Sequence, residues 1–140
     1  MNFFPSVKWY TKVFFILFVV FIFMNLSIND NKFKVKLAIT SSQIQNGMTG
    51  KNFNEEYNGL YFIMPYKGEQ SFWMRDCLVP LDIIMIDGNV ITSIHENCEP
   101  CDELDCESYK GYGDKVLEIA GGTCERLGIK KGDNVSFSLL

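Results

Sequence analysis

Alternating apolar and polar side chains predict the first strand of a compact domain. The alternation covers residues 33–39, and a period of two is typical of a half-buried strand. Thr40 is followed three residues later by Gln43, which fits a capping box at the start of a helix. Gly47 then suits the end of that helix. This part of the chain is therefore predicted to form a strand followed by a short helix.

Further apolar runs, separated by turn residues, predict six more strands. We expect Pro65 to end one strand and Gly68 to mark the turn before the next. Asp87-Gly88-Asn89 is a hairpin signal, and Thr123 is predicted to cap a second short helix that Gly128 terminates. The runs cover residues 59–64, 71–74, 81–86, 90–94, 116–119 and 135–139. About seven short strands and two brief helices predict a mainly β domain, a small barrel or sandwich without repeats.

The N-terminal residues 1–30 follow a different pattern, that of a segment that enters a membrane. Lys8 and Lys12 precede an uninterrupted apolar run over residues 13–24. Extended over residues 10–29, the run reaches the length of about 20 residues that a spanning helix needs. No small-x-small cleavage site follows, so we predict an uncleaved signal anchor rather than a signal peptide. The single domain of residues 31–140 is then expected outside the cytoplasm, in the periplasm or extracellular, and secreted if the segment is cleaved.

The charge balance argues against one class of partner. The chain of 140 residues has a formal net charge of -4, and it shows no stripe of basic residues. Proteins that bind nucleic acids present such a stripe to the phosphate backbone. We therefore expect no nucleic-acid partner, and we predict a monomer.

Four possible metal ligands lie within twelve positions. They are His95, Cys98, Cys101 and Cys106, and thiolates and imidazoles suit zinc. Acidic residues crowd the same segment, and like charges disfavour the thiolate form. The spacing of Cys98 and Cys101 is also that of thiol-redox enzymes, but no βαβ pattern accompanies it. Because an oxidising compartment preserves disulfides, a disulfide is favoured over a metal site or a redox module, with no cofactor.

Aromatic and charged side chains around two strands predict a binding surface. Phe72 and Trp73 are adjacent on a strand, so only one can point into the core of a one-sided sheet. The other must be covered or face a ligand, with nearby charges for orientation. The predicted ligand contacts are Trp73, Arg75, Asp76, Asp82 and His95. The alternative is an envelope enzyme with Asp82, His95 or Glu118 as acid–base groups, although no nucleophile motif accompanies them.

Several segments, in order along the chain, carry a family resemblance. They are Gly59-Leu60-Tyr61-Phe62, Ser71-Phe72-Trp73-Met74-Arg75-Asp76, Pro80-Leu81-Asp82-Ile83-Ile84, Pro100-Cys101, Leu117-Glu118-Ile119-Ala120-Gly121-Gly122, Gly128-Ile129 and Gly132-Asp133. From about Lys34 to the C-terminus the chain resembles the domain of unknown function 192 family. The resemblance implies a β-barrel-like fold behind a signal or anchor, and a bridge between Cys101 and Cys106. It implies no biochemical activity.

The chain departs from the family pattern at Asp76-Cys77, at Thr49-Gly50 and at Cys124. The sequence as a whole predicts a membrane-anchored or secreted β-barrel module. We expect it to bind a small ligand or an envelope partner without catalysis. An envelope enzyme and a metal or thiol-redox module are the alternatives.

Overall fold

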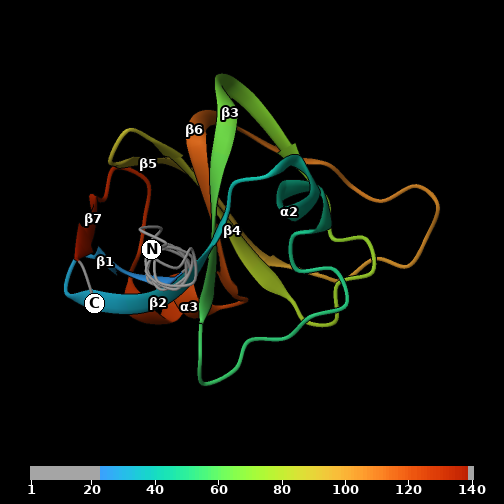
Figure 1. The fold of residues 1–140 in the computed structure, drawn as a ribbon, viewed down its shortest axis with the longest axis horizontal. Coiled ribbons are helices and arrows are strands. Elements are labelled where there is room, and N and C mark those ends of the chain that lie inside the picture. The colour runs from blue at the N-terminus through green and yellow to red at the C-terminus, as the bar shows by residue number, and fades with distance from the viewer. Residues whose placement is uncertain (1–22, 139–140) are drawn as a thin grey trace, which may run out of the picture.

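A single curled sheet dominates the computed structural model, which describes residues 23–138 (Figure 1). Its seven strands follow the order β5-β4-β6-β3-β2-β1-β7, and only the β2–β3 pair is parallel. The strands are β1 (Phe23–Ile28), β2 (Asn31–Ala38), β3 (Gly59–Phe72), β4 (Leu81–Asp87), β5 (Val90–Cys98), β6 (Tyr109–Ala120) and β7 (Val135–Ser138). Two short helices, α2 (Ser41–Asn46) and α3 (Thr123–Leu127), complete the described part.

The sheet curls until its two edge strands, β5 and β7, approach each other at one end. Main-chain N–H groups of Ile91 and Val135 donate to the carbonyls of Asp133 and Asn89, at 3.0 and 2.8 Å. These bonds connect the start of β5 with the turn that leads into β7. The result is a half-barrel, which confirms the predicted mainly β fold class.

The sheet is buried on both faces, which gives the domain two apolar cores. On β4, Ile84 and Ile86 belong to one core while Ile83 and Met85 belong to the other, and all four are 0% exposed. This alternation follows from the opposite directions of successive side chains along a strand. Helix α3 contributes Cys124 to the first core, and α2 packs Ile44 against the second.

The predicted membrane segment over residues 10–29 needs correction at its end. Residues 23–28 form β1, which pairs with β2 and β7, and Leu26 and Ile28 are completely buried. The cause is visible in the sequence, because Met24, Leu26 and Ile28 alternate with polar residues as strand residues do. The rest of the predicted segment lies outside the described residues. Within residues 23–138, no helix combines the length and the apolar character that a membrane crossing requires.

The prediction that Pro65 ends a strand is wrong. Strand β3, which is 14 residues long in total, continues through Pro65 to Phe72. Its register against β6 shifts between Ile63 and Gly68. A proline is tolerated at such an irregularity, where its missing N–H is not needed for the ladder. The predicted hairpin at residues 87–89 is confirmed, since β4 and β5 are antiparallel neighbours around it.

The predicted boundaries of α2 are confirmed, but the start of α3 differs. Thr40 Oγ1 accepts from the Gln43 amide at 3.2 Å, and the Gln43 side chain accepts from the Thr40 amide at 3.1 Å. In α3 the N-cap is Gly122 rather than Thr123, so the N-cap residue supplies no side-chain hydrogen bond to the helix. Gly128, with φ of 68°, ends α3 as predicted.

Candidate functional site

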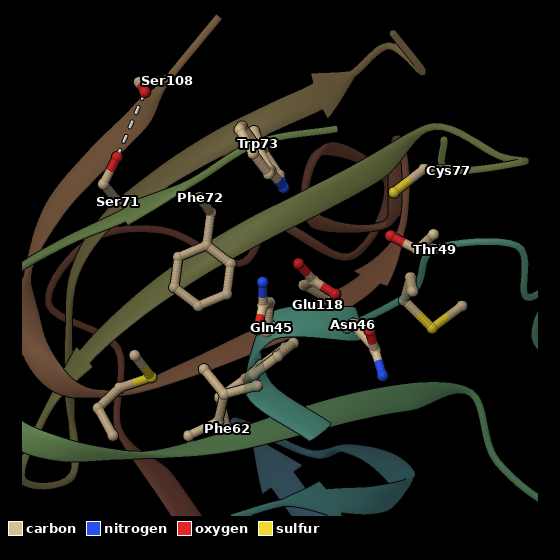
Figure 2. A pocket seen from close by; sticks show the side chains of 14 residues that line it. Gln45, Asn46, Thr49, Phe62, Ser71, Phe72, Trp73, Cys77, Ser108 and Glu118 are labelled. Carbon is tan, nitrogen blue, oxygen red and sulfur yellow. Dashed lines mark hydrogen bonds between the residues drawn. The ribbon is translucent and has the colours of Figure 1, made fainter. Parts of the chain in front are cut away.

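A cavity of about 310 Å³ opens beside α2, where the end of β3 and the middle of the sheet meet (Figure 2). Phe62, Phe72 and Trp73 supply aromatic walls, and Gln45 and Asn46 contribute from α2. The rings of Phe62 and Phe72 meet edge to face, with centroids 5.0 Å apart. The site is therefore an apolar hollow with a polar rim, the usual character of small-molecule pockets.

Glu118 of β6 lies at the centre of the side chains that line the cavity (Figure 2). On this strand Val116 belongs to the core beneath α2, whereas Leu117 and Ile119 belong to the opposite core. Alternation therefore directs Glu118 to the side of α2. The residue is only 4% exposed, and its main-chain neighbours on the adjacent strands are Leu60 and Ile83.

The carboxyl group of Glu118 is buried, and one of its two oxygens lacks a hydrogen bond in the described part of the chain. Within residues 23–138, its Oε2 atom has no hydrogen-bond partner. Burial raises the pKa of Glu118 to about 8, against a smaller lowering effect of Lys51. Loss of water disfavours the charged form, which is the usual cause of such a shift. At neutral pH the group is therefore mainly protonated and can both donate and accept a hydrogen bond.

The chain after α2 passes close over this carboxyl group. Gly47 has φ of 45°, and a Cβ atom at its position would lie 3.4 Å from the Phe62 ring and 3.8 Å from Glu118 Oε2. The Lys51 ammonium group donates to the Gly47 carbonyl at 3.0 Å. The absence of a side chain at Gly47 thus keeps the space above Glu118 open.

Cys77 lines the same cavity from the loop after β3, where it is half-buried. Burial raises the pKa of its thiol to about 11, and the nearby Glu118 and Asp76 act in the same direction. The reactive form of a cysteine is the thiolate. At neutral pH Cys77 is therefore a neutral and weakly reactive group of the cavity wall.

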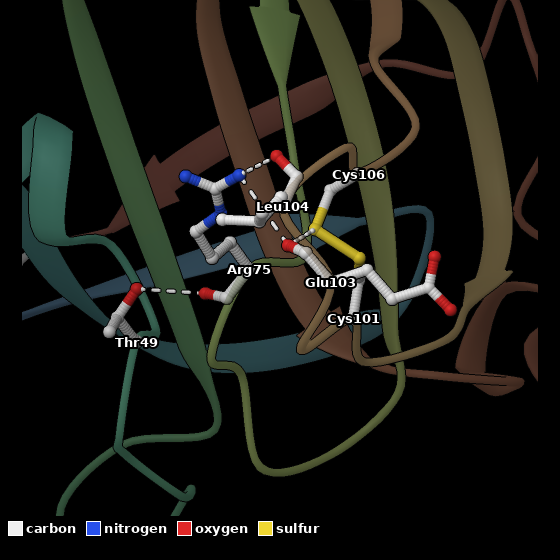
Figure 3. The surroundings of a disulfide bond; sticks show 6 residues. All are labelled: Thr49, Arg75, Cys101, Glu103, Leu104 and Cys106. Carbon is white, nitrogen blue, oxygen red and sulfur yellow. Dashed lines mark hydrogen bonds between the residues drawn. A yellow bond between two sulfur atoms is a disulfide. The ribbon is translucent and has the colours of Figure 1, made fainter.

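Trp73 is the one predicted ligand contact that lines the cavity, and it is 49% exposed. Arg75 stacks on it, with the guanidinium carbon 4.5 Å from the centre of the indole. The same guanidinium group donates to the main-chain carbonyls of Leu104 and Glu103 (Figure 3). Asp76 is exposed, and its main chain bonds Gly50 and Cys101. Arg75 supports the cavity wall, and Asp76 joins the loops around it.

Asp82 is completely buried on the face of the sheet opposite to Glu118. Its carboxylate accepts main-chain N–H bonds from Asn97, Gly122 and Cys124 at 2.7, 3.0 and 2.7 Å. It thereby satisfies the amides at the start of α3 that Thr123 is predicted to cap. This carboxylate holds β4, β5 and the start of α3 together.

His95 lies outside the cavity, where its Nε2 atom is 2.7 Å from the Lys110 carbonyl and its ring meets Tyr109 edge to face. The acid–base groups of the predicted enzyme are thus dispersed. Glu118 lines the cavity, Asp82 bonds main chain on the other face, and His95 contacts β6. The ligand-binding roles of Arg75, Asp76, Asp82 and His95 stay predictions.

The predicted disulfide between Cys101 and Cys106 is confirmed, with Cα atoms 6.0 Å apart. A zinc site cannot use both of these sulfur atoms while they are bonded to each other. Residues 23–138 hold no cluster of His, Cys, Asp and Glu arranged for a metal ion. Cys98 is buried and free, and Cys101 is bonded to Cys106 instead of to Cys98.

Sequence reasoning named Glu118 as an enzyme group only and left out the cavity walls from Phe62 and Cys77. One signal was present, since Glu118 is the single charge within the apolar run of residues 116–120. A charge in a strand buried on both faces needs a partner or a ligand. The cavity itself depends on the position of α2 relative to the sheet, which local sequence patterns do not predict.

Two solved structures share this fold. A "putative transcription regulator" from Sinorhizobium meliloti has a TM-score of 0.74 and 25% identity, over 84% of this chain and 95% of its own. A protein of unknown function from Novosphingobium aromaticivorans has a TM-score of 0.69 and 31% identity, over 81% of this chain and 83% of its own. No curated protein matches the chain. The family model of DUF192, described as an uncharacterized ACR, matches residues 24–137, so the chain belongs to the DUF192 family.

Proposed function

We propose that the domain binds a small molecule in the cavity beside α2 and leaves it chemically unchanged. The observation that carries the proposal is the Oε2 atom of Glu118, which is buried in the cavity without a partner among the described residues. A buried polar group without a hydrogen bond costs about 1–3 kcal/mol. A ligand that bonds to Glu118 removes this cost, so the carboxyl group favours an occupied cavity.

The size and lining of the cavity support a small ligand with an apolar body. Its volume of about 310 Å³ is at the lower end of the range of about 300–1,000 Å³ for ligand pockets. The rings of Phe62, Phe72 and Trp73 cover apolar surface, and Glu118 fixes the orientation of one polar group. Trp73 is the exposed member, which places it at the mouth.

The protonation states of the cavity support binding rather than catalysis. Cys77 keeps its proton at neutral pH because burial raises its pKa to about 11, and a thiol is a poor nucleophile. Asp82 and His95 lie elsewhere and bond main-chain groups. Among the described residues that line the cavity, Glu118 therefore meets neither a thiolate nor the His95 imidazole that could complete an acid–base pair.

A second candidate function is an enzyme in which Glu118 is a general acid. Its pKa of about 8 lies close to neutral pH, which is where acid–base catalysts work best. The two functions differ in the fate of the ligand. Recovery of an unchanged ligand after prolonged incubation supports the binding protein, and a product that Glu118→Gln does not form supports the enzyme.

We propose further that residues 1–22 export the domain across a membrane. With residues 23–28 in β1, the apolar run that remains covers residues 13–22. Ten residues match the apolar core of a signal peptide, about 7–15 residues, better than a spanning helix of about 20. The disulfide also favours an oxidising compartment. A fusion of alkaline phosphatase after residue 138 should be active in bacterial cells, and an inactive fusion would contradict export.

Ligand binding is tested by thermal unfolding with three probes that share a phenyl ring. The probes are 2-phenylethylamine, 2-phenylethanol and phenylacetate, which differ in charge. The proposal expects at least one of them to raise Tm in a saturable manner. Gln45→Trp, which adds a ring to the cavity from an exposed helix position, should abolish the effect. If no probe raises Tm, or if the Gln45 variant responds equally, the cavity is not the binding site.

A further inference from the structure

We infer that the ligand is an organic cation, a molecule with an apolar body and one ammonium group that pairs with the Glu118 carboxylate in the cavity. The inference rests on the proposed function and specifies the class of ligand. It is carried by the geometry of one buried acid among aromatic rings, with no basic side chain among the described residues that line the hollow.

The charges of the lining favour a cation over an anion. Among the described residues, those that line the cavity include no Lys, Arg or His, and their ionisable groups are Glu118 and Cys77. An anionic ligand would find no opposite charge and would face a carboxyl group. A cation would pair with Glu118 in a site of low dielectric, where charge pairing is strong.

The ammonium group of Lys51, which lowers the pKa of Glu118, does not take this role. Lys51 donates to the Gly47 carbonyl at 3.0 Å, and it lines a separate hollow together with Lys36 and Tyr57. No salt bridge joins it to Glu118 in the described part of the chain. The position opposite the Glu118 carboxyl group is therefore available to a ligand.

The aromatic walls suit the same ligand. Phe62, Phe72 and Trp73 present three rings around one acid, and aromatic faces attract ammonium groups by their quadrupole. The stacking of Arg75 on Trp73 at 4.5 Å is an instance of this attraction at the rim. An aromatic wall with one carboxyl group therefore combines two kinds of attraction for a cation.

The loop beside the cavity adds further negative charge, which also favours a cation. Ser108 lines the cavity and bonds Ser71 at 3.3 Å, and the segment that precedes it is strongly acidic. Its exposed acidic residues are Glu99, Asp102, Glu103, Asp105 and Glu107. Negative charge around a cleft raises the local concentration of cations and disfavours anions.

Cation binding should displace the proton of Glu118 into solvent. Lys51 lowers the pKa of this carboxyl group, and the Glu118 charge in turn raises the pKa of the Cys77 and Cys98 thiols. Both cysteines are neutral at pH 7, so Glu118 is the group that changes. With a pKa of about 8, binding should release most of one proton at pH 7 and a clearly smaller fraction at pH 8.5.

The experiment is isothermal titration calorimetry of the whole chain with 2-phenylethylamine, in two buffers that differ in ionisation enthalpy. The wild type should bind the amine more tightly than 2-phenylethanol or phenylacetate and release the stated protons. Glu118→Gln should weaken the amine by at least about 30-fold, since it removes one partner of a buried charge pair. The alcohol should change by less than about threefold.

Two further measurements keep the outcomes separate. Lys51→Ala, an exposed substitution, should increase the number of protons released at pH 8.5, because it removes a charge that lowers the pKa of Glu118. Circular dichroism and Tm of Glu118→Gln establish that it folds. The inference of an organic cation is overturned if the wild type prefers the alcohol or phenylacetate, or if Glu118→Gln binds the amine with unchanged affinity. Either result leaves the proposal of ligand binding intact. No binding of any probe to the wild type overturns both proposals.

Discussion

The guanidinium carbon of Arg75 lies 4.5 Å from the centre of the Trp73 indole. The Nη2 atom of the same group donates to the Leu104 carbonyl inside the loop closed by the disulfide. One side chain thus connects a wall of the cavity to a loop that has no core of its own. Cys101 also bonds the main chain of Met74 and Asp76, at 3.0 and 2.9 Å. The covalent closure of the loop therefore supports the position of Trp73.

Removal of the disulfide should destabilise the domain modestly and loosen the indole. We expect the double variant Cys101→Ser/Cys106→Ser to lose about 2 kcal/mol of unfolding free energy, as the chain-entropy relation gives for so short a loop. Trp73 fluorescence should shift to the red, measured in a Trp9→Phe background so that one indole reports. Urea unfolding gives the free energy.

Arg75→Gln provides the matched control, because it breaks the contact and keeps the bridge. It should reproduce the fluorescence shift with about 1 kcal/mol of destabilisation, as expected for a stacking contact that is partly accessible to solvent. An unchanged spectrum in both variants would show that the loop does not hold Trp73.

Asp82→Asn should be among the most destabilising single changes at a polar residue. The carboxylate accepts three main-chain N–H bonds and is completely buried, and charge-assisted bonds are about twice as strong as neutral ones. An amide can accept on one atom only, so we expect a loss of about 2–4 kcal/mol in urea unfolding. Ligand affinity of the folded fraction should stay within about twofold of wild type. A stable Asp82→Asn protein that loses binding would instead place Asp82 in the site.

Sequence periodicity predicted most of the fold because the strands alternate or form apolar runs between turn residues. The hairpin at Gly88, the capping box of Thr40 and the end of α3 at Gly128 depend on local chemistry, and all three are confirmed. Two errors in the prediction cancelled each other, so that the predicted number of strands equals the observed number. The continuation of β3 past Pro65 joined two predicted strands, and β1 was hidden in the apolar N-terminal run.

The site was less predictable because it depends on contacts between distant segments. Asp82 and Glu118 are both acids in apolar strands, yet the register places them on opposite faces with different surroundings. Three amides surround Asp82, whereas Glu118 faces a cavity that exists only once α2 is docked. Local sequence gives both residues the same description. Only the tertiary structure distinguishes a structural acid from a candidate ligand group.

Cys77 should react slowly with alkylating reagents and become slower still when the cavity is filled. With a pKa raised to about 11, its thiolate fraction at pH 8 is more than about 100-fold below that of a free cysteine. Iodoacetamide labelling of Cys77, followed by mass spectrometry, should accelerate about tenfold per pH unit between pH 7 and 9. Addition of 2-phenylethylamine should protect it. Rapid labelling at pH 7 would contradict the described environment, and Cys77→Ser identifies the site.

The stability of the domain should decrease with rising pH because of Glu118. Its folded pKa of about 8 lies above the ordinary value of 4.5, so between these limits the unfolded chain has lost a proton that the folded protein keeps. Each pH unit in this window then favours the unfolded state by about 1.4 kcal/mol. Below pH 4.5 the contribution is fully present, and above pH 8 it is lost and the slope vanishes.

The matched comparison is Glu118→Gln, which keeps the shape and cannot titrate. The difference in unfolding free energy between wild type and variant should decline steadily from pH 5 to pH 7.5, since all other titrating groups contribute to both. Urea unfolding at half-unit intervals measures it. Parallel curves would mean that Glu118 is charged in the folded protein. If the decline with pH is present without ligand and disappears with saturating 2-phenylethylamine, the titration of Glu118 is linked to ligand binding.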